Sequence, residues 1–300
     1  YMNAAKMENK GLELDGSWLL MNQEDQALDL YFNWAQNKNK VLDLYGTDVI
    51  YLGTGSVNSV AIVGHPVGTL HGTGSQTDNG KVDGKLILDD NGFPQITSLK
   101  MVLGDPNPDW RASVGLNARW GNFNMNVLFE HSQGGDYSPR TQWLLRRFGT
   151  TEETANLIES TPKELVNFDG DTIPAGTFVR GNIHNFGGGD VLLDEAWYRH
   201  GIGGGFGDNQ AYNFAVKDAT FSRIRELSLS YTYTSPAFRE ATKLSSVTLR
   251  ATGRNLWTWY KELVGIDPAT NQAGMANGFG LDYFTNPSTK SYLFTVSVNF

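Results

Sequence analysis

Residues 109–132 decide the fold, and they read DWRASVGLNARW followed by GNFNMNVLFEHS. In the first half, apolar residues occupy every second position from Trp110 to Trp120, with polar or small residues between them. The second half resumes this alternation at Phe123, after a turn around Gly121. A period of two residues indicates a β-strand with one apolar and one polar face. The stretch therefore predicts an antiparallel hairpin.

The same alternation recurs in five other places. These segments are centred on residues 12–20, 28–34, 227–233, 247–259 and 292–300. Together with the hairpin they make roughly seven predicted strands of about ten residues or more. The composition agrees with an all-β protein, because aromatic residues make up 12% of the chain and 34 of its residues are glycine.

The connections between the predicted strands alternate strictly between short and long. The short ones are MNQEDQ (21–26), the turn at Gly121 and TSPAFREATKLSS (234–246), whereas the long ones span about 38–108, 134–216 and 261–288. Compact soluble domains rarely contain connections of such length. Short periplasmic turns and long extracellular loops are typical of a transmembrane β-barrel.

The long connections also carry local signals of structure. VLDLYGTDVIYLG (41–53) and KVDGKLILDDNGFPQ (81–95) predict strands extended above the membrane, with a turn at DDNG. SPRTQWLLRRFG (138–149) and TTEETANLIES (150–160) predict short helices, the second opening with a capping box from Thr150 to Glu153.

Aromatic residues lie near the ends of the predicted strands. A strand of ten residues at about 3.3 Å per residue, tilted by about 40°, rises about 25 Å, close to the apolar thickness of an outer-membrane barrel. We therefore expect a group of membrane-interface aromatics. They are Trp18, Trp34, Trp110, Trp120, Tyr231, Tyr233, Trp257, Trp259, Tyr292 and Phe300.

Two other architectures fit part of the pattern. A soluble, secreted carbohydrate-binding β-sandwich also alternates, and it would pack the face of Trp110, Val114 and Leu116 against a second sheet. A small self-contained outer-membrane barrel is the other alternative. Single-chain bacterial barrels have an even number of strands. A count of seven therefore means that one strand is missed or that the chain is part of a larger barrel.

Composition excludes several classes of function. The chain has no cysteine, which excludes disulfide scaffolds, thiol catalysis and thiolate metal sites. Its net charge of −8 argues against a nucleic-acid partner. None of its five histidines shows the spacing of a metal-ligand motif. We therefore expect no catalytic centre, cofactor or metal site, and no enzymatic activity.

Short motifs along the whole chain resemble the C-terminal half of SusC/RagA-type TonB-dependent outer-membrane transporters. The motifs are MENKGLELDGSW (7–18), NKNKVLDL (37–44), IVGHPVGTLHG (62–72), LGDPNPDWRASVG (103–115), HSQGGD (131–136), DATFSRIRELSLSYTY (218–233), GRNLWTW (253–259) and LDYFTNPSTKSYLFTVSVNF (281–300). Each motif is weak alone, and their order and spacing carry the resemblance.

The resemblance implies an antiparallel barrel of 22 strands in the outer membrane, of which residues 1–300 would supply the C-terminal part. It implies an N-terminal plug and a TonB-contacting segment, neither of which is found in this chain. It also implies a SusD-like lipoprotein lid as a partner, the inner-membrane TonB complex as the energy source, and an oligosaccharide or a peptide as the substrate.

The long loops offer candidate substrate-binding residues. They are Trp143, Arg146, Arg147, Trp197, Tyr198 and Arg199. Aromatic rings stack on sugars and guanidinium groups donate forked hydrogen bonds, which is why these residue types suit a glycan or peptide ligand. The alternative is that QWLLRRF (142–148) and EAWYRHG (195–201) only pack their own loops, or contact the lid protein.

Overall fold

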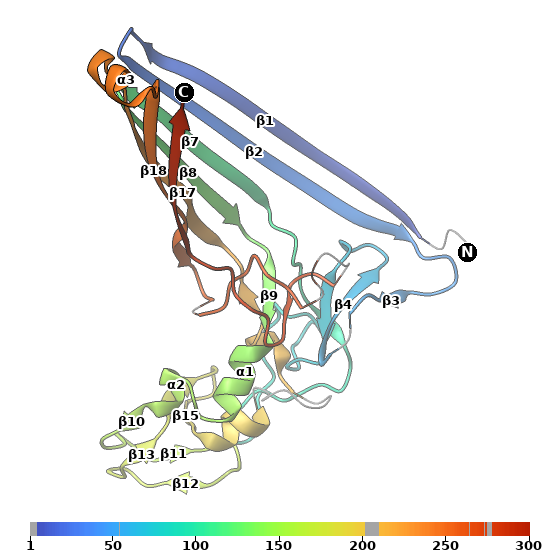
Figure 1. Ribbon diagram of the computed structural model, residues 1–300. Coiled ribbons are helices and arrows are strands. Elements are labelled where there is room, and N and C mark those ends of the chain that lie inside the picture. The colour runs from blue at the N-terminus through green and yellow to red at the C-terminus, as the bar shows by residue number, and fades with distance from the viewer. Residues whose placement is uncertain (1–4, 54, 202–209, 264, 273, 275–277) are drawn as a thin grey trace.

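Seven antiparallel strands form the main sheet of the protein. The computed structural model describes residues 5–53, 55–201, 210–263, 265–272, 274 and 278–300. The sheet order is β1 (Lys6–Asn22), β2 (Gln26–Asp43), β7 (Trp110–Trp120), β8 (Phe123–Gln133), β17 (Phe221–Tyr233), β18 (Ser246–Tyr260) and β20 (Ser291–Asn299). The seven predicted strands are all present, in chain order, and the sheet is curved and open (Figure 1).

The register confirms the two predicted faces. Val114 of β7 lies opposite Phe32 of β2 and Phe129 of β8, and this apolar row continues to Ile224 and Trp257. In β17 the register shifts between Ile224 and Glu226. This irregularity leaves Arg225 on the polar side with Glu130, to which its guanidinium pairs at 3.4 Å. A second register shift lies between Leu19 and Met21. Because of it, Met21 takes the outward position that the alternation predicted for Leu20.

The two edges of the sheet are β1 and β20. Among the described residues, β1 pairs with β2 alone and β20 with β18 alone. Phe294 and Phe300 of the last segment are 85% and 91% exposed. The sheet is therefore open at both edges among the described residues, and we call it the wall.

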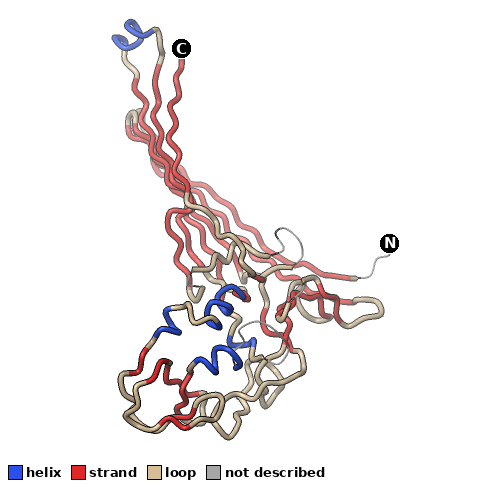
Figure 2. The backbone as a smooth tube through the Cα atoms, turned by 60° about the horizontal axis from the view of Figure 1, so that its bottom comes forward, coloured by secondary structure: helices blue, strands red, loops and turns tan. Residues whose placement is uncertain are grey.

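The connections at one end of the sheet are short and those at the other end are long, as predicted. Figure 2 shows the sheet as a band of strands with one helix at its far end and the remaining helices among the long connections. That isolated helix is α3 (Pro236–Thr242), within the connection from β17 to β18. The Ser235 hydroxyl accepts a hydrogen bond from the Phe238 N–H, and Pro236 takes the first helical position, which begins the helix.

The long connections contain many short elements. The first holds β3 (Val49–Tyr51), β4 (Val57–Ile62), β5 (Thr69–Gly72) and β6 (Met101–Gly104). The second holds β9 (Asp136–Pro139), α1 (Arg140–Arg147), α2 (Glu152–Ala155), β10 (Leu157–Ile158), β11 (Leu165–Val166), β12 (Thr172–Ile173), β13 (Val179–Arg180), β14 (Asn182–Asn185), β15 (Asp190–Leu193), a π-helix at Trp197–Gly201, a 3₁₀-helix at Tyr212–Phe214 and β16 (Lys217–Asp218). The third holds β19 (Leu281–Asp282).

Three local predictions for these connections need correction. Residues 81–95 form only isolated bridges, although the turn at DDNG is present, with Gly92 at φ 86° and its N–H bonded to the Asp89 carbonyl. The second predicted helix shrinks to one turn. Its N-cap is Thr151, and the Thr150 hydroxyl bonds back to the Leu145 carbonyl, so the capping box does not form.

The hydrophobic cores lie in the long connections. One cluster joins all three of them, because Leu70 of β5, Trp143 of α1 and Leu281 of β19 pack together. A second gathers Phe93, Val191, Trp197 and Tyr198, and a third gathers Val41, Leu44 and Ala61. The three connections are therefore folded as one unit at one end of the sheet, which we call the loop domain (Figure 1).

Candidate functional site

The apolar face of the sheet is uncovered. Val114 is 44% exposed, Trp257 53% and Trp120 72%. The sandwich alternative requires a second sheet over this face, which would bury these side chains. Their exposure contradicts that alternative within the described residues. None of the helices in the described part has the length and apolar character needed to cross a membrane.

The opposite face is polar and concave. Asn126 donates to Asn117 at 2.6 Å, and Arg254 pairs with Glu226 at 2.9 Å. A hollow of about 620 Å³ lies against this face and is lined by residues from β2 to β18, including Asp29 and Arg250. The strands thus turn charged and amide side chains toward a shared interior.

The predicted interface aromatics occupy defined places in the register. Trp34 and Trp259 share a row near the long connections, and Trp110 lies at the same end of β7. Trp120 and Tyr231 share a row at the short-turn end, and Tyr233 lies beyond it. Trp18 lies opposite Leu30, in the row that ends at Tyr292.

A second cavity, of about 620 Å³, lies where the polar face meets the loop domain. Arg111, Glu130, Arg225 and Asp136 are among its lining residues. Burial raises the pKa of Asp136 to about 6; the Asp105 N–H opposes this rise, and the carboxylates of Asp105, Asp218 and Asp109 add to it. Sequence reasoning missed this cavity, although HSQGGD was one of the recognised motifs.

A buried ion pair ties the third connection to the wall. Arg223 of β17 and Asp267 are each 1% exposed, and Nη2 of the arginine lies 2.9 Å from Oδ1 of the aspartate. Asp267 also accepts hydrogen bonds from the backbone N–H groups of Ala269 and Ser288 and from the Ser288 hydroxyl. Burial opposes ionisation of Asp267, yet these bonds and Arg223 hold its pKa below the ordinary value.

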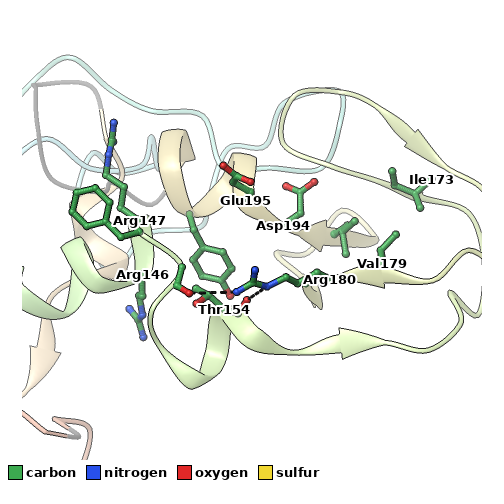
Figure 3. Close-up of a pocket in the computed structure, with 13 residues that line it drawn as sticks. Arg146, Arg147, Thr154, Ile173, Val179, Arg180, Asp194 and Glu195 are labelled. Carbon is green, nitrogen blue, oxygen red and sulfur yellow. Dashed lines mark hydrogen bonds between the residues drawn. The ribbon is translucent and has the colours of Figure 1, made fainter.

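The third cavity lies in the second long connection and contains three of the predicted binding residues. It has a volume of about 440 Å³, and Arg146, Arg147 and Tyr198 line it together with Arg180, which sequence reasoning missed (Figure 3). Ile173, Val179, Leu192 and Phe148 add apolar surface, and Asp194 and Glu195 add two carboxylates. We call this the arginine cavity.

The polar groups of the arginine cavity are held by hydrogen bonds. Arg180 donates to the carbonyls of Thr154 and Gly149, at 2.6 and 3.3 Å. Arg147 donates to the Arg199 carbonyl at 2.9 Å. Arg146 pairs with Glu153 at 2.8 Å. Burial, followed by the Glu153 carboxylate, raises the pKa of Tyr198 to about 12.

The other three predicted binding residues do not line this cavity. Trp143 and Trp197 are each 2% exposed and belong to two hydrophobic clusters. Trp143 stacks on Tyr212 and donates to the Ala215 carbonyl at 3.0 Å, so its ring is not available to a ligand in this conformation. Arg199 pairs with Glu195 at 2.7 Å on the surface. For the two tryptophans the structure favours the packing alternative.

Within the residues that the structure describes, no group of three or more His, Asp or Glu side chains is arranged to hold a metal ion.

Comparison with known proteins finds relatives of this chain. No family model matches it. Two curated relatives from Formosa agariphila match it: TonB-dependent receptor P3 is 24% identical over 99% of this chain, and TonB-dependent receptor P26 is 26% identical over 96%. The resemblance to the TonB-dependent receptors is confirmed. This chain spans 29% of the length of each of these relatives.

Solved structures show the same fold. The RagAB peptide transporter matches with a TM-score of 0.64 at 16% identity, over 100% of this chain and 30% of the neighbour. The RagAB importer in its closed-closed state matches with a TM-score of 0.63. The sheet thus has the fold of a section of the barrel in these solved structures, and the larger-barrel explanation of the seven strands is the one that these lengths support.

Proposed function

We propose that this chain supplies barrel wall and extracellular loops to an outer-membrane TonB-dependent importer. The cargo is an oligosaccharide or a peptide. A SusD-like lipoprotein closes the mouth, and the TonB complex acts through a segment outside these 300 residues. The relatives are receptors and transporters, and the chain itself carries no proposed catalytic role.

The observation that carries the proposal is how the register arranges the aromatic residues. One step of two residues along a strand is about 6.7 Å, so a tilt of about 40° makes it about 5 Å of height. The spacing of about 4.8 Å between neighbouring strands becomes about 3 Å of height. The strands can tilt in either of two directions. We take the direction that places the three short turns at the same height to within about 5 Å, because the opposite direction does not.

With that tilt, the aromatics fall into two belts at different heights along the barrel axis. The upper belt spans only about 3 Å in height, although its residues lie in different rows of the register; it contains Trp110, Trp257 and Tyr292. The lower belt spans about 6 Å in height and contains Trp18, Trp120, Tyr231, Tyr233 and Phe300. The mean heights of the two belts differ by about 22 Å. This separation agrees with an apolar band of about 25 Å between two interfaces.

Two of the predicted interface residues fit less closely. Trp259 lies about 5 Å outside the upper belt and Trp34 about 7 Å inside it, by the same arithmetic. We assign Trp259 to the headgroup region and Trp34 to the apolar band. The agreement of the other eight supports an outer-membrane location over a soluble one.

Localisation and uptake test the proposal together. The full-length receptor should fractionate with the outer membrane and require detergent for extraction. Cells carrying the receptor should take up a labelled peptide or oligosaccharide pool, and deletion of TonB should abolish the uptake. A receptor that is soluble without detergent, or uptake that is unchanged without TonB, refutes the proposal.

A further inference from the structure

The arginine cavity has the chemistry of a site for the end of a peptide. Its volume of about 440 Å³ lies within the usual range for ligand sites, about 300–1,000 Å³. It lies in the loop domain, among α1, α2, β13 and the π-helix, away from the polar face of the sheet (Figures 1 and 3).

Among the residues that the structure describes, two of its guanidinium groups lack a carboxylate partner. Arg146 is neutralised by Glu153. Arg147 and Arg180 donate only to backbone carbonyls, which leaves their positive charges uncompensated by hydrogen-bonded carboxylates. Both side chains retain further N–H donors, and the guanidinium fork matches a carboxylate in shape and charge. This side of the cavity suits a single carboxylate.

The carboxylates of the cavity are already occupied by other partners. Asp194 accepts hydrogen bonds from the Asn167 amide at 3.0 Å and the Ala196 N–H at 3.0 Å. Glu195 pairs with Arg199. They do not neutralise Arg147 or Arg180, and their remaining lone pairs can accept N–H groups. A polyanionic glycan would be repelled by them, whereas a peptide offers N–H donors beside one terminal carboxylate.

The rest of the lining is apolar. Ile173, Val179 and Leu192 contribute aliphatic surface, and Phe148, which is 68% exposed, adds an aromatic ring. Sugar hydroxyl groups placed against aliphatic side chains lose hydrogen bonds to water without replacement. An apolar side chain of a ligand gains from the same contact.

We infer that the arginine cavity binds the C-terminal residue of a peptide cargo. The terminal carboxylate lies between Arg147 and Arg180, and an apolar side chain lies against Ile173, Val179 and Leu192. The inference rests on the proposed import function, and it assigns the cargo to the peptide class.

The test measures binding to the full-length receptor in detergent by calorimetry. The probes are acetyl-Ala-Ala-Leu as the free acid, the same peptide as its C-terminal amide, and a uronic acid disaccharide. We expect the free acid to bind at least tenfold more tightly than the amide and the disaccharide. Equal binding of acid and amide, or tighter binding of the disaccharide, overturns the inference, and neither comparison depends on a variant.

Three variants place the site. Arg147→Gln should weaken the free acid about tenfold, the scale of one charge-assisted hydrogen bond, and leave the amide unchanged. Val179→Thr should weaken the Leu-ended peptide more than a Gly-ended one. Arg239→Gln, on the exposed surface of α3, is the matched control and should change neither. Unchanged affinity in both cavity variants overturns the assignment. The outcome is separate from the proposed function, because TonB-dependent uptake can persist while this site proves wrong.

Discussion

Replacing Asp267 by Asn tests whether charge holds the third long connection to the barrel wall. The change keeps the size of the side chain and removes its charge, so Arg223 is left buried without a counter-ion. Breaking a buried ion pair in this way typically costs about 3–5 kcal/mol. Asn keeps one acceptor oxygen, so it can still accept from the Ala269 N–H or from Ser288 but not from both, and the double variant below separates that loss from the loss of charge.

Amide hydrogen exchange of residues 265–290 in the full-length receptor measures this effect. At about 1.4 kcal/mol per factor of ten, the loss should speed exchange by about two to nearly four powers of ten, up to the limit set by local opening. Asp218→Asn is the matched control. It removes the partner of Lys261 at the start of the same connection, but that pair is exposed, with side-chain exposures of 57% and 24%, and should be worth about 1 kcal/mol or less.

Two results would refute the reasoning. The first is an exchange rate in Asp267→Asn that rises no more than in Asp218→Asn. The second concerns the double variant Arg223→Met with Asp267→Asn, which removes both charges and should recover most of the lost protection. If it exchanges as fast as the single variant, the hydrogen bonds of Asp267, and not its charge, hold the connection.

Three other variants follow from the structure. Val114→Arg should lower the folded, heat-modifiable fraction of the receptor in the outer membrane, because a cation on a lipid-facing strand position costs about 2–4 kcal/mol near the midplane. Its control, Asn117→Arg on the polar face, should fold normally. Asp136→Asn should raise the melting temperature at pH 8 and much less at pH 4. The folded pKa of about 6 lies above the ordinary value of 3.8, so the cost of ionising Asp136 builds up as the pH rises between these values. An equal gain at both pH values would show that charge is not responsible. Trp143→Ala should cost about 3–5 kcal/mol in the loop domain and speed tryptic cleavage of residues 140–216 without changing the heat modifiability of the barrel. Unchanged cleavage would contradict its core role.

Hydrophobic alternation was enough to predict the strands where one face of the sheet is apolar. From Trp110 to Trp120 the predicted and observed strand agree in both limits. In contrast, β1 and β2 continue well beyond their apolar segments, pairing Asn9 with Asn39 and Lys10 with Lys38. Above an apolar band, neither face needs hydrophobic residues, so no periodic signal marks these extensions.

The arginine cavity was predictable only in part, for a similar reason. The aromatic and basic composition of α1 and of the π-helix was enough to predict binding residues there, and three of them line the cavity: Arg146, Arg147 and Tyr198. Arg180 stands in a two-residue strand without any pattern, and only the tertiary pairing of Leu157 with Arg180 brings it close. An aromatic residue in a loop has the same sequence signal whether it stacks on a ligand or fills a core. For this reason the sequence predicts a binding role for Trp143 and Trp197, which are buried.

The separation of the hydrophobic clusters from the apolar face of the sheet has an evolutionary consequence. Within the described residues, side chains on that face are covered by no second layer, so exchanges among Val, Leu, Ile and Phe there disturb few neighbours. The loop domain must instead keep close packing among three distant stretches of chain, since Leu70, Trp143 and Leu281 meet in one cluster. The sheet and the loop domain can therefore diverge under different constraints, and the surface of the loops can change without any change to the outward face of the sheet.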